Sequence, residues 1–231
     1  MNDEEDDMDD IENEVEILKI VFVGETGVGK TSIFSQFIDD VFHESFQAST
    51  GATYHTKSFL FDDGKELKLD IWDTAGQEKY RALTQMFYKD ANAAILVYDI
   101  TNQDSFEELK NYWVKQIKES SSSNIIIVID ANKSDLIGEE QVNEEDARKF
   151  AEEVNAIFCC TSAKNKVGID DIFVEIVKKH TGRTDFKILT EKVEEKDEKE
   201  RQDSHSYSIS GSLKLTMANS YTDKKKKKCC N

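Results

Sequence analysis

Short runs of apolar residues alternate with amphipathic segments through the middle of the chain. The runs are rich in Ile, Val and Phe, as strands are, and the amphipathic segments repeat apolar positions with the period of a helix. We expect strands near residues 17–23, 54–62, 66–72, 93–99, 125–130 and 156–161, and helices near residues 30–39, 104–119, 143–154 and 169–179. This alternation predicts an α/β fold with a mostly parallel sheet.

The dipeptide Asp63-Gly64 separates the second and third expected strands. It is typical of a tight hairpin, so one strand should run antiparallel to the others. We therefore predict a doubly wound, six-stranded sheet with one antiparallel strand and helices on both faces. Ligands of such sheets bind at the carboxyl ends of the strands.

The two ends of the chain differ in composition from this central region. Residues 1–16 hold ten acidic residues and no basic one, and they have too little apolar surface to offset the entropy lost on folding. Residues 181–231 are charged and then rich in serine. We therefore predict two disordered tails around one domain at residues 17–180. The net charge of -17 argues against nucleic acid as a partner, although the first tail carries much of it.

A glycine-rich loop of the form G-x-x-x-x-G-K-T follows the first expected strand. Its glycines let backbone N–H groups wrap a phosphate, Lys30 brings a positive charge to the terminal phosphates, and the Thr31 hydroxyl can ligate Mg²⁺. Such a string can arise by chance in a loop, but its place between a buried strand and a helix is what nucleoside triphosphates require. The candidate residues are Gly24, Glu25, Thr26, Gly27, Val28, Gly29, Lys30, Thr31 and Ser32.

Two later strings can select the base. Asn132-Lys133-Ser134-Asp135 follows the fifth strand, and the Asp135 carboxylate can accept hydrogen bonds from N1–H and the exocyclic amine of guanine, which adenine does not offer. Asn132 can bond the other edge of the ring, and the Lys133 stem can lie along its face. After the last strand stand Ser162, Ala163 and Lys164, where the Ala163 N–H can meet the guanine oxygen.

The third strand ends in Trp72-Asp73-Thr74-Ala75-Gly76-Gln77-Glu78. Asp73 can hold Mg²⁺ through water, the Gly76 N–H can bond a γ-phosphate, and Gln77 can orient an attacking water. Together with the phosphate loop and the guanine strings, in this order, the segment resembles the Ras superfamily of small GTPases over roughly residues 17–180. Segment 72–78, Tyr80-Arg81, residues 94–101 and a terminal cysteine pair look like the Rab branch, and Phe42-His43-Glu44 with Gly51-Ala52 look like its endocytic members.

The resemblance implies the small G domain of P-loop NTPases, with GTP or GDP and Mg²⁺ as ligands and with two switch segments that present a surface to effectors. Phe42 matches an aromatic residue that packs on the base, although it can also be ordinary core. The first switch reads Ser49-Thr50-Gly51, without the usual isoleucine, so either Ser49 or Thr50 can stand at the Mg²⁺ position. We assign Thr50 to the metal, and both residues to the nucleotide.

The resemblance also implies regulation by an exchange factor, an activating protein and a prenyl-binding escort protein. Lys30 and Gln77 are the catalytic candidates. No arginine occurs between Lys30 and Tyr80, so the first switch cannot supply a charge-stabilising finger. Hydrolysis should therefore be slow without an activating protein that contributes an arginine.

Five lysines precede Cys229-Cys230-Asn231. This ending looks like the Rab double-cysteine type, which implies two geranylgeranyl groups on Cys229 and Cys230; together with the lysines they meet the requirement of two signals for stable anchoring. We expect the protein on the cytoplasmic face of an intracellular membrane, endosomal if the endocytic resemblance holds, and cycling with the cytosol. The alternatives are a merely solubilising lysine tail and a metal site that also uses Cys159 and Cys160, whose adjacent positions in a strand make it a poor rival.

Two other functions remain open. A GTP-bound module that only docks effectors would need no hydrolysis, and Gln77 argues against it. An ATP-dependent small-molecule kinase would explain the phosphate loop, but it leaves Asp135 without a role.

Overall fold

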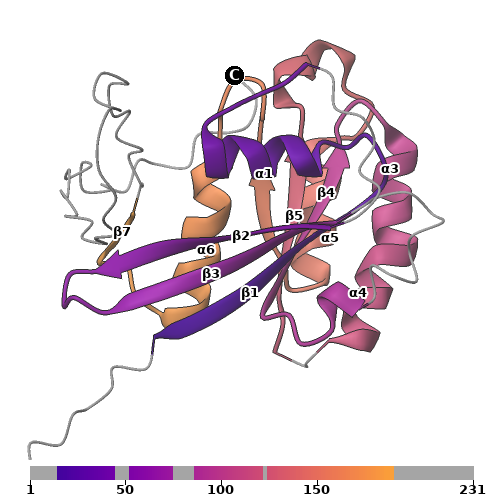
Figure 1. Ribbon diagram of the computed structural model, residues 1–231. Coiled ribbons are helices and arrows are strands. Elements are labelled where there is room, and N and C mark those ends of the chain that lie inside the picture. The colour runs from indigo at the N-terminus through magenta and orange to yellow at the C-terminus, as the bar shows by residue number, and fades with distance from the viewer. Residues whose placement is uncertain (1–14, 45–51, 75–85, 122–123, 190–231) are drawn as a thin grey trace, which may run out of the picture.

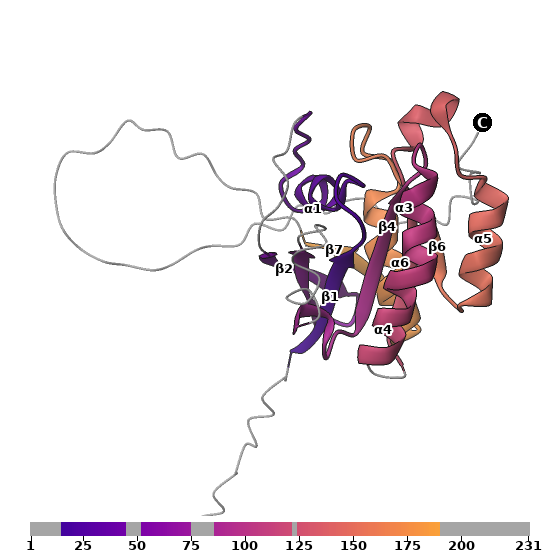
Figure 2. The same cartoon turned by 90° about the vertical axis from the view of Figure 1, so that its right-hand side faces the viewer.

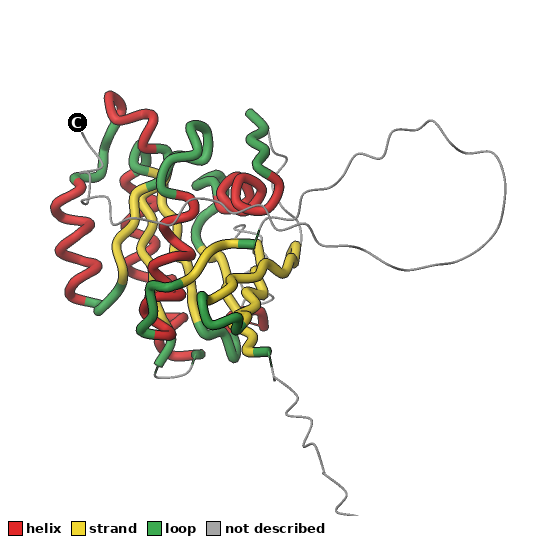
Figure 3. The backbone as a smooth tube through the Cα atoms, turned by 90° about the vertical axis from the view of Figure 1, so that its left-hand side faces the viewer, coloured by secondary structure: helices red, strands yellow, loops and turns green. Residues whose placement is uncertain are grey.

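The computed structural model describes residues 15–44, 52–74, 86–121 and 124–189. Within these ranges the chain forms a seven-stranded sheet in the order β6-β5-β4-β1-β3-β2-β7. The strands are β1 (Glu16–Val23), β2 (Ala52–Phe61), β3 (Glu66–Thr74), β4 (Ala93–Asp99), β5 (Ile126–Asn132), β6 (Ile157–Cys160) and β7 (Phe186–Ile188). Figure 3 shows them as a layer flanked by helices.

The helices are α1 (Lys30–Asp39), α3 (Gln103–Glu108), α4 (Val114–Ser120), α5 (Glu144–Glu153) and α6 (Ile169–Thr181). A π-helical turn, η2 (Leu109–Trp113), joins α3 to α4, and Figure 2 shows the three as one continuous helical segment. A 3₁₀ helix, η3 (Ser134–Glu139), follows β5. No helix in the described ranges is long and apolar enough to cross a membrane.

Local sequence explains where several helices begin and end. Asn102 and Asn143 cap α3 and α5, each with a side-chain oxygen that accepts hydrogen bonds from the first turn. Gly168 precedes α6 and Gly182 ends it, both in the left-handed conformation.

The central strands are buried on both faces, and all residues of β4 and β5 are buried. One face packs against α1 and α6, where Phe37 and Phe173 stack with their ring centroids 3.6 Å apart. The other face packs against the helical segment from α3 to α4 and against α5, and Trp113 and Leu109 are buried in this second core. These two cores fix the carboxyl ends of β1, β3, β5 and β6 at one edge, where the loops of interest emerge.

The predicted fold class is confirmed: β1 pairs in parallel with β3 and β4, β4 with β5, and β5 with β6, while β2 runs antiparallel to β3 through the expected hairpin. The predicted count of six strands is wrong, because β7 pairs antiparallel with β2 at the edge of the sheet. β2 thus remains the one strand that runs against the rest.

β7 lies beyond residue 180, the predicted end of the domain. Phe186 of this strand packs edge-on against Phe59 and Phe61, with ring centroids 5.6 and 5.7 Å apart. Arg183 lies over the Phe61 ring at 4.2 Å and pairs with Asp63 at 2.8 Å and with Asp185. Aromatic packing and ion pairs therefore hold this strand on the hairpin, so the folded unit continues to Ile188.

Candidate functional site

A cleft of about 380 Å³ lies at the carboxyl ends of the strands, between the loop after β1 and the loops after β5 and β6. Its size is in the range of small-molecule sites. Residues of three predicted strings line the cleft: the phosphate loop, the string Asn132–Asp135 and the string Ser162–Lys164. The lining residues are Thr26, Gly27, Gly29, Lys30, Thr31, Ser32, Phe42, His43, Glu44, Thr74, Asn132, Lys133, Asp135, Leu136, Ala163 and Lys164.

The phosphate loop has a conformation that only glycines tolerate at its two ends. Gly24 has φ +140° and Gly29 has φ +101°. A Cβ atom at Gly24 would lie 2.4 Å from the Val97 carbonyl oxygen, and one at Gly29 would lie 2.2 Å from Asn132 Nδ2. The glycines of the motif are therefore required by close approach as well as by backbone angle.

The Lys30 ammonium is held inside the loop. Its Nζ donates hydrogen bonds to the carbonyl oxygens of Gly24 and Glu25, over 2.8 and 2.7 Å. Burial lowers the pKa of Lys30 to about 8, against the opposing influence of the Asp73 and Glu25 carboxylates. A bound polyphosphate would add negative charge at the same place and favour the protonated ammonium.

Thr31 and Asp73 form a pair suited to a hard cation. Thr31 Oγ1 donates to Asp73 Oδ2 over 2.7 Å, and Asp73 is only 1 % exposed. Asp73 Oδ1 is buried with no hydrogen-bond partner among the described residues. Burial raises the pKa of Asp73, against the Thr31 hydrogen bond and the Lys30 charge. A hydroxyl and a carboxylate with a spare oxygen are the ligand types that Mg²⁺ takes, so these residues fit the predicted metal.

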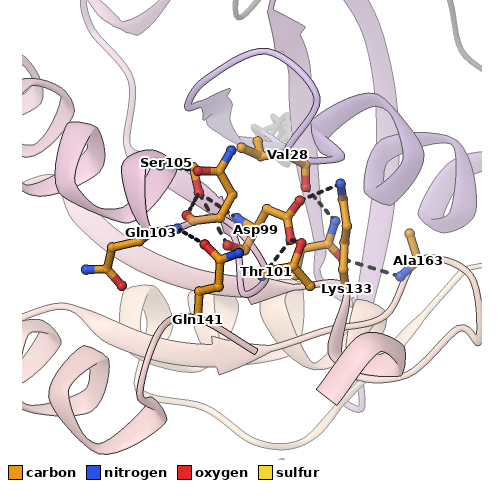
Figure 4. A network of polar contacts seen from close by, with 10 residues as sticks. Val28, Asp99, Thr101, Gln103, Ser105, Lys133, Gln141 and Ala163 are labelled. Carbon is orange, nitrogen blue, oxygen red and sulfur yellow. Dashed lines mark hydrogen bonds and ion pairs between the residues drawn. The ribbon is translucent and has the colours of Figure 1, made fainter. Parts of the chain in front are cut away.

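Asn132 joins the two halves of the cleft. Its Nδ2 donates to the Val28 carbonyl oxygen over 2.8 Å, and its Oδ1 accepts the Ala163 N–H at 3.4 Å. Figure 4 labels Val28 and Ala163, the two partners of Asn132. Asn132 therefore ties the phosphate loop to both loops that were predicted to select the base.

Asp135 and Ser162 are paired. Ser162 Oγ donates to Asp135 Oδ1 over 2.5 Å, and it also accepts the Asn165 N–H at 3.1 Å. Ser162 is buried, whereas Asp135 lines the cleft. Among the described residues, Ser162 thus contacts the carboxylate that would read the base.

Lys133 is fixed by Asp99, a residue that was not predicted. Its backbone has φ +68°, and its Nζ pairs with Asp99 Oδ2 at 2.6 Å (Figure 4). The other Asp99 oxygen accepts the N–H and the hydroxyl of Thr101 over 2.9 and 2.7 Å. Asp99 ends the fully buried β4, and a polar residue at the carboxyl end of such a strand is the signal that could have pointed to it.

Comparison with known proteins agrees with this geometry. The model of the Ras family matches residues 19–181. Rab-22A from human, named Ras-related protein Rab-22A, is 44 % identical over 162 residues, which cover 70 % of this chain and 82 % of the relative. Mouse Rab-22A is 42 % identical over the same shares. This chain belongs to the Rab family of the Ras superfamily. Members of this family are GTPases, so the chain is a GTPase.

The remaining predicted residues of this Rab family member lie in the cleft, in the core or outside the described residues. Phe42 both lines the cleft and packs against the core beside α1. Glu25 is not among the residues that line the cleft, and its Oε1 accepts the indole N–H of Trp113 at 3.0 Å. Val28 is buried in the core. Ser49, Thr50, Gly76, Gln77, Cys229 and Cys230 lie outside the described residues.

Four residues that line the cleft were not predicted: His43, Glu44, Thr74 and Leu136. His43, Thr74 and Leu136 directly follow the predicted residues Phe42, Asp73 and Asp135, and Glu44 lies two positions after Phe42. Thr74 is buried and donates through its hydroxyl to the Phe22 carbonyl oxygen over 2.7 Å, so it connects the end of β3 to β1. Proximity to the motifs was the only signal for them.

Proposed function

We propose that this protein is a membrane-anchored switch that binds GTP and GDP with Mg²⁺, hydrolyses GTP slowly and recruits effectors in vesicle trafficking. The observation that carries the proposal is the single cleft shared by Lys30 and Asp135. Lys30 is presented for phosphates and Asp135 for a base. Their co-location supports a guanine nucleotide rather than phosphate alone as the ligand.

The chain's own residues have separable roles in this reaction. Lys30 would bind the terminal phosphates, and the loop amides around it would orient them. Thr31 and Asp73 would hold Mg²⁺, with Thr50 as the further ligand proposed from the sequence; when bound, the ion neutralises charge that develops on the β- and γ-phosphate oxygens. Gly76 would donate to the γ-phosphate, and Gln77 would orient the attacking water.

Slow hydrolysis follows from the absence of an arginine between Lys30 and Tyr80. An arginine supplied by an activating protein is worth about 10³ to 10⁵ in rate. Effectors would bind the two switch segments, and an exchange factor would reset the protein to the GTP form. We propose Cys229 and Cys230 as the lipidation sites, with a prenyl-binding escort protein as carrier and an endosomal membrane as destination.

The decisive experiment has two steps. GDP should compete with fluorescent GDP in magnesium buffer, and ADP should not; equal competition would refute the proposal. Single-turnover hydrolysis should then be slow alone and accelerated by an activating protein for Rab family members, and Gln77→Leu should abolish the acceleration. Accelerated hydrolysis that is equal in the wild type and Gln77→Leu would remove Gln77 from the mechanism, and no hydrolysis in either would favour a docking module.

Membrane anchoring needs its own test. The double variant with Cys229→Ser and Cys230→Ser should bind GDP like the wild type but move from the membrane fraction to the cytosol. Unchanged fractionation would reject lipidation at these cysteines.

A further inference from the structure

Asp130 is a carboxylic acid buried beneath the guanine-selecting loops. It stands on β5 two residues before Asn132, and it is 0 % exposed. Its Oδ1 has no hydrogen-bond partner among the described residues, and its Oδ2 lies 3.0 Å from Thr161 Oγ1. An ionised carboxylate with a bare oxygen in this position would be costly, whereas a neutral acid leaves only a carbonyl oxygen unpaired.

Thr161 connects this acid to the guanine motif. Its Oγ1 lies 3.2 Å from Asn132 Oδ1 as well as 3.0 Å from Asp130 Oδ2. A hydroxyl carries one hydrogen, so it cannot donate fully to both oxygens. If Asp130 is ionised, the Thr161 hydrogen goes to its carboxylate and Asn132 loses a donor.

A protonated Asp130 removes this conflict. Its own O–H then donates to Thr161 Oγ1, and the Thr161 hydrogen is free to donate to Asn132 Oδ1. All three side chains form a chain of hydrogen bonds that runs toward the nucleotide cleft. The Asn132 amide at the end of the chain also donates to the Val28 carbonyl oxygen, so the relay reaches the phosphate loop.

The surroundings favour the protonated form. Burial raises the pKa of Asp130 to about 7, although the Thr161 hydrogen bond opposes the rise. The ionisable neighbours are Tyr98 on β4 and Cys159 on β6, and the charge of Asp130 contributes to raising the pKa of each. Around Cys159, Asp171 and Glu175 from α6 add negative charge and Arg148 from α5 adds positive charge.

We infer that Asp130 is a positioning residue for guanine nucleotide binding, which in its protonated form lets the Thr161 hydroxyl donate to Asn132 and in its ionised form withdraws that hydrogen bond. The inference rests on the proposed binding of a guanine nucleotide. Its consequence is that the nucleotide dissociates faster as the pH rises through neutrality. The loss is about one hydrogen bond at Asn132, which corresponds to about threefold to tenfold in rate.

The test is the rate of fluorescent GDP release from the full chain with Mg²⁺ between pH 6 and pH 8.5. Wild type should release GDP about threefold to tenfold faster at the upper end. Asp130→Asn cannot ionise but keeps a donor for Thr161, so its rate should change less with pH. Lys30, with a pKa of about 8, also titrates in this range, but it is present in both proteins. The ratio of their release rates at each pH therefore isolates the effect of Asp130. Parallel pH profiles for the two would overturn the inference.

Thr161→Val tests the relay itself. This variant keeps Asp130 and the shape of residue 161 but removes the hydroxyl. The rate of GDP release from Thr161→Val should therefore depend on pH as weakly as the rate from Asp130→Asn does. A pH profile in Thr161→Val that matches wild type would show that Asp130 does not act through Thr161.

Carbon-13 NMR of the Asp130 carboxyl group in the wild type provides a measurement that needs no variant and no nucleotide. Titration near pH 7 is expected, and titration below pH 5 would overturn the inference. If GDP fails to bind while the carboxyl group titrates near neutrality, the proposed function is refuted and the protonation of Asp130 is not.

Discussion

Thr31 at the start of α1 donates a hydrogen bond of 2.7 Å to Asp73 Oδ2 at the end of β3, 42 positions along the chain. The pairing joins the start of α1, directly after the phosphate loop, to the end of β3. Asp73 Oδ1 is buried and has no hydrogen-bond partner among the described residues, so the pair keeps one carboxylate oxygen available to a cation.

Asp73→Asn should lower the affinity for Mg²⁺ by about 10- to 100-fold, because it removes the negative charge that holds the ion through its water shell. Thr31→Val should also lower the affinity for Mg²⁺. Thr31→Ser is the matched control because it retains the hydroxyl. The measurement is the rate of GDP release with and without EDTA. Chelation should accelerate release strongly in wild type and Thr31→Ser, and weakly in Asp73→Asn. An equal effect of EDTA on all of these proteins would contradict the assignment.

Gly24→Ala should destabilise the fold far more than Gly64→Ala, although both glycines have positive φ. A Cβ at Gly24 would lie 2.4 Å from the backbone oxygen of Val97, whereas a Cβ at Gly64 meets nothing within 4 Å. The left-handed conformation costs about 1–2 kcal/mol in either variant, and the collision adds about 1–3 kcal/mol at Gly24. Urea unfolding of the two proteins measures the difference. Equal free energies of unfolding would mean that the loop shifts to admit the methyl group.

The parts of the site that the sequence predicted are contiguous strings whose function depends on local backbone geometry. Gly24–Thr31 could be read as a phosphate loop because its glycines and lysine act within eight residues. Asn132 and Asp135 could likewise be predicted, because both lie in one short string that follows a buried strand. The hairpin at Asp63-Gly64 was predicted for the same reason, since the turn residues themselves determine it.

The parts that the sequence did not predict depend on the register between distant strands. Asp99 meets Lys133 because β4 and β5 pair in parallel with Asp99 opposite Asn132. No local pattern marks Asp130 and Thr161 as partners, because the relay exists only once β5 and β6 are side by side. β7 was missed because it has three residues, and its packing on Phe59 and Phe61 is decided by tertiary contact rather than by its own pattern.

Phe186→Ala should detach β7 from the edge of the sheet. The half-buried ring contacts both Phe59 and Phe61, so its loss should cost about 1–2 kcal/mol of local stability, less than the loss of a fully buried phenylalanine. Hydrogen exchange at two amides reports on this strand directly: Asp62 N–H donates to the Asp185 carbonyl at 3.0 Å, and Leu189 N–H donates to the Ser58 carbonyl at 2.9 Å.

Both amides should exchange about fivefold to thirtyfold faster in Phe186→Ala, as a loss of about 1–2 kcal/mol requires at about 1.4 kcal/mol per factor of ten. Lys187→Ala is the control, because it changes the same strand without removing a ring contact. Exchange that is accelerated equally in Phe186→Ala and Lys187→Ala would show that the aromatic packing is not what holds β7.

The contribution of Asp130 to the free energy of unfolding should fall as the pH rises from about 4 to about 7. The pKa of Asp130 is raised by burial from 3.8 to about 7, so the folded protein binds a proton over this interval that the unfolded chain has released. The stabilisation is fully present below the unfolded value and is lost as the pH passes through the folded value. At about 1.4 kcal/mol per pKa unit, the difference sets an upper limit of about 4 kcal/mol.

Other carboxylates also titrate in this range, so the informative quantity is the difference in the free energy of unfolding between wild type and Asp130→Asn. Asparagine matches the protonated acid in size and cannot ionise. The free energy of unfolding of wild type should therefore fall relative to that of Asp130→Asn as the pH rises from 4. The difference should level off above about pH 7.5. Urea unfolding at several pH values, with GDP absent, measures it independently of nucleotide binding. A difference that stays constant with pH would mean that Asp130 is already ionised in the folded protein, and the buried carboxylate would then need a hydrogen-bond donor that the described residues do not supply at its Oδ1.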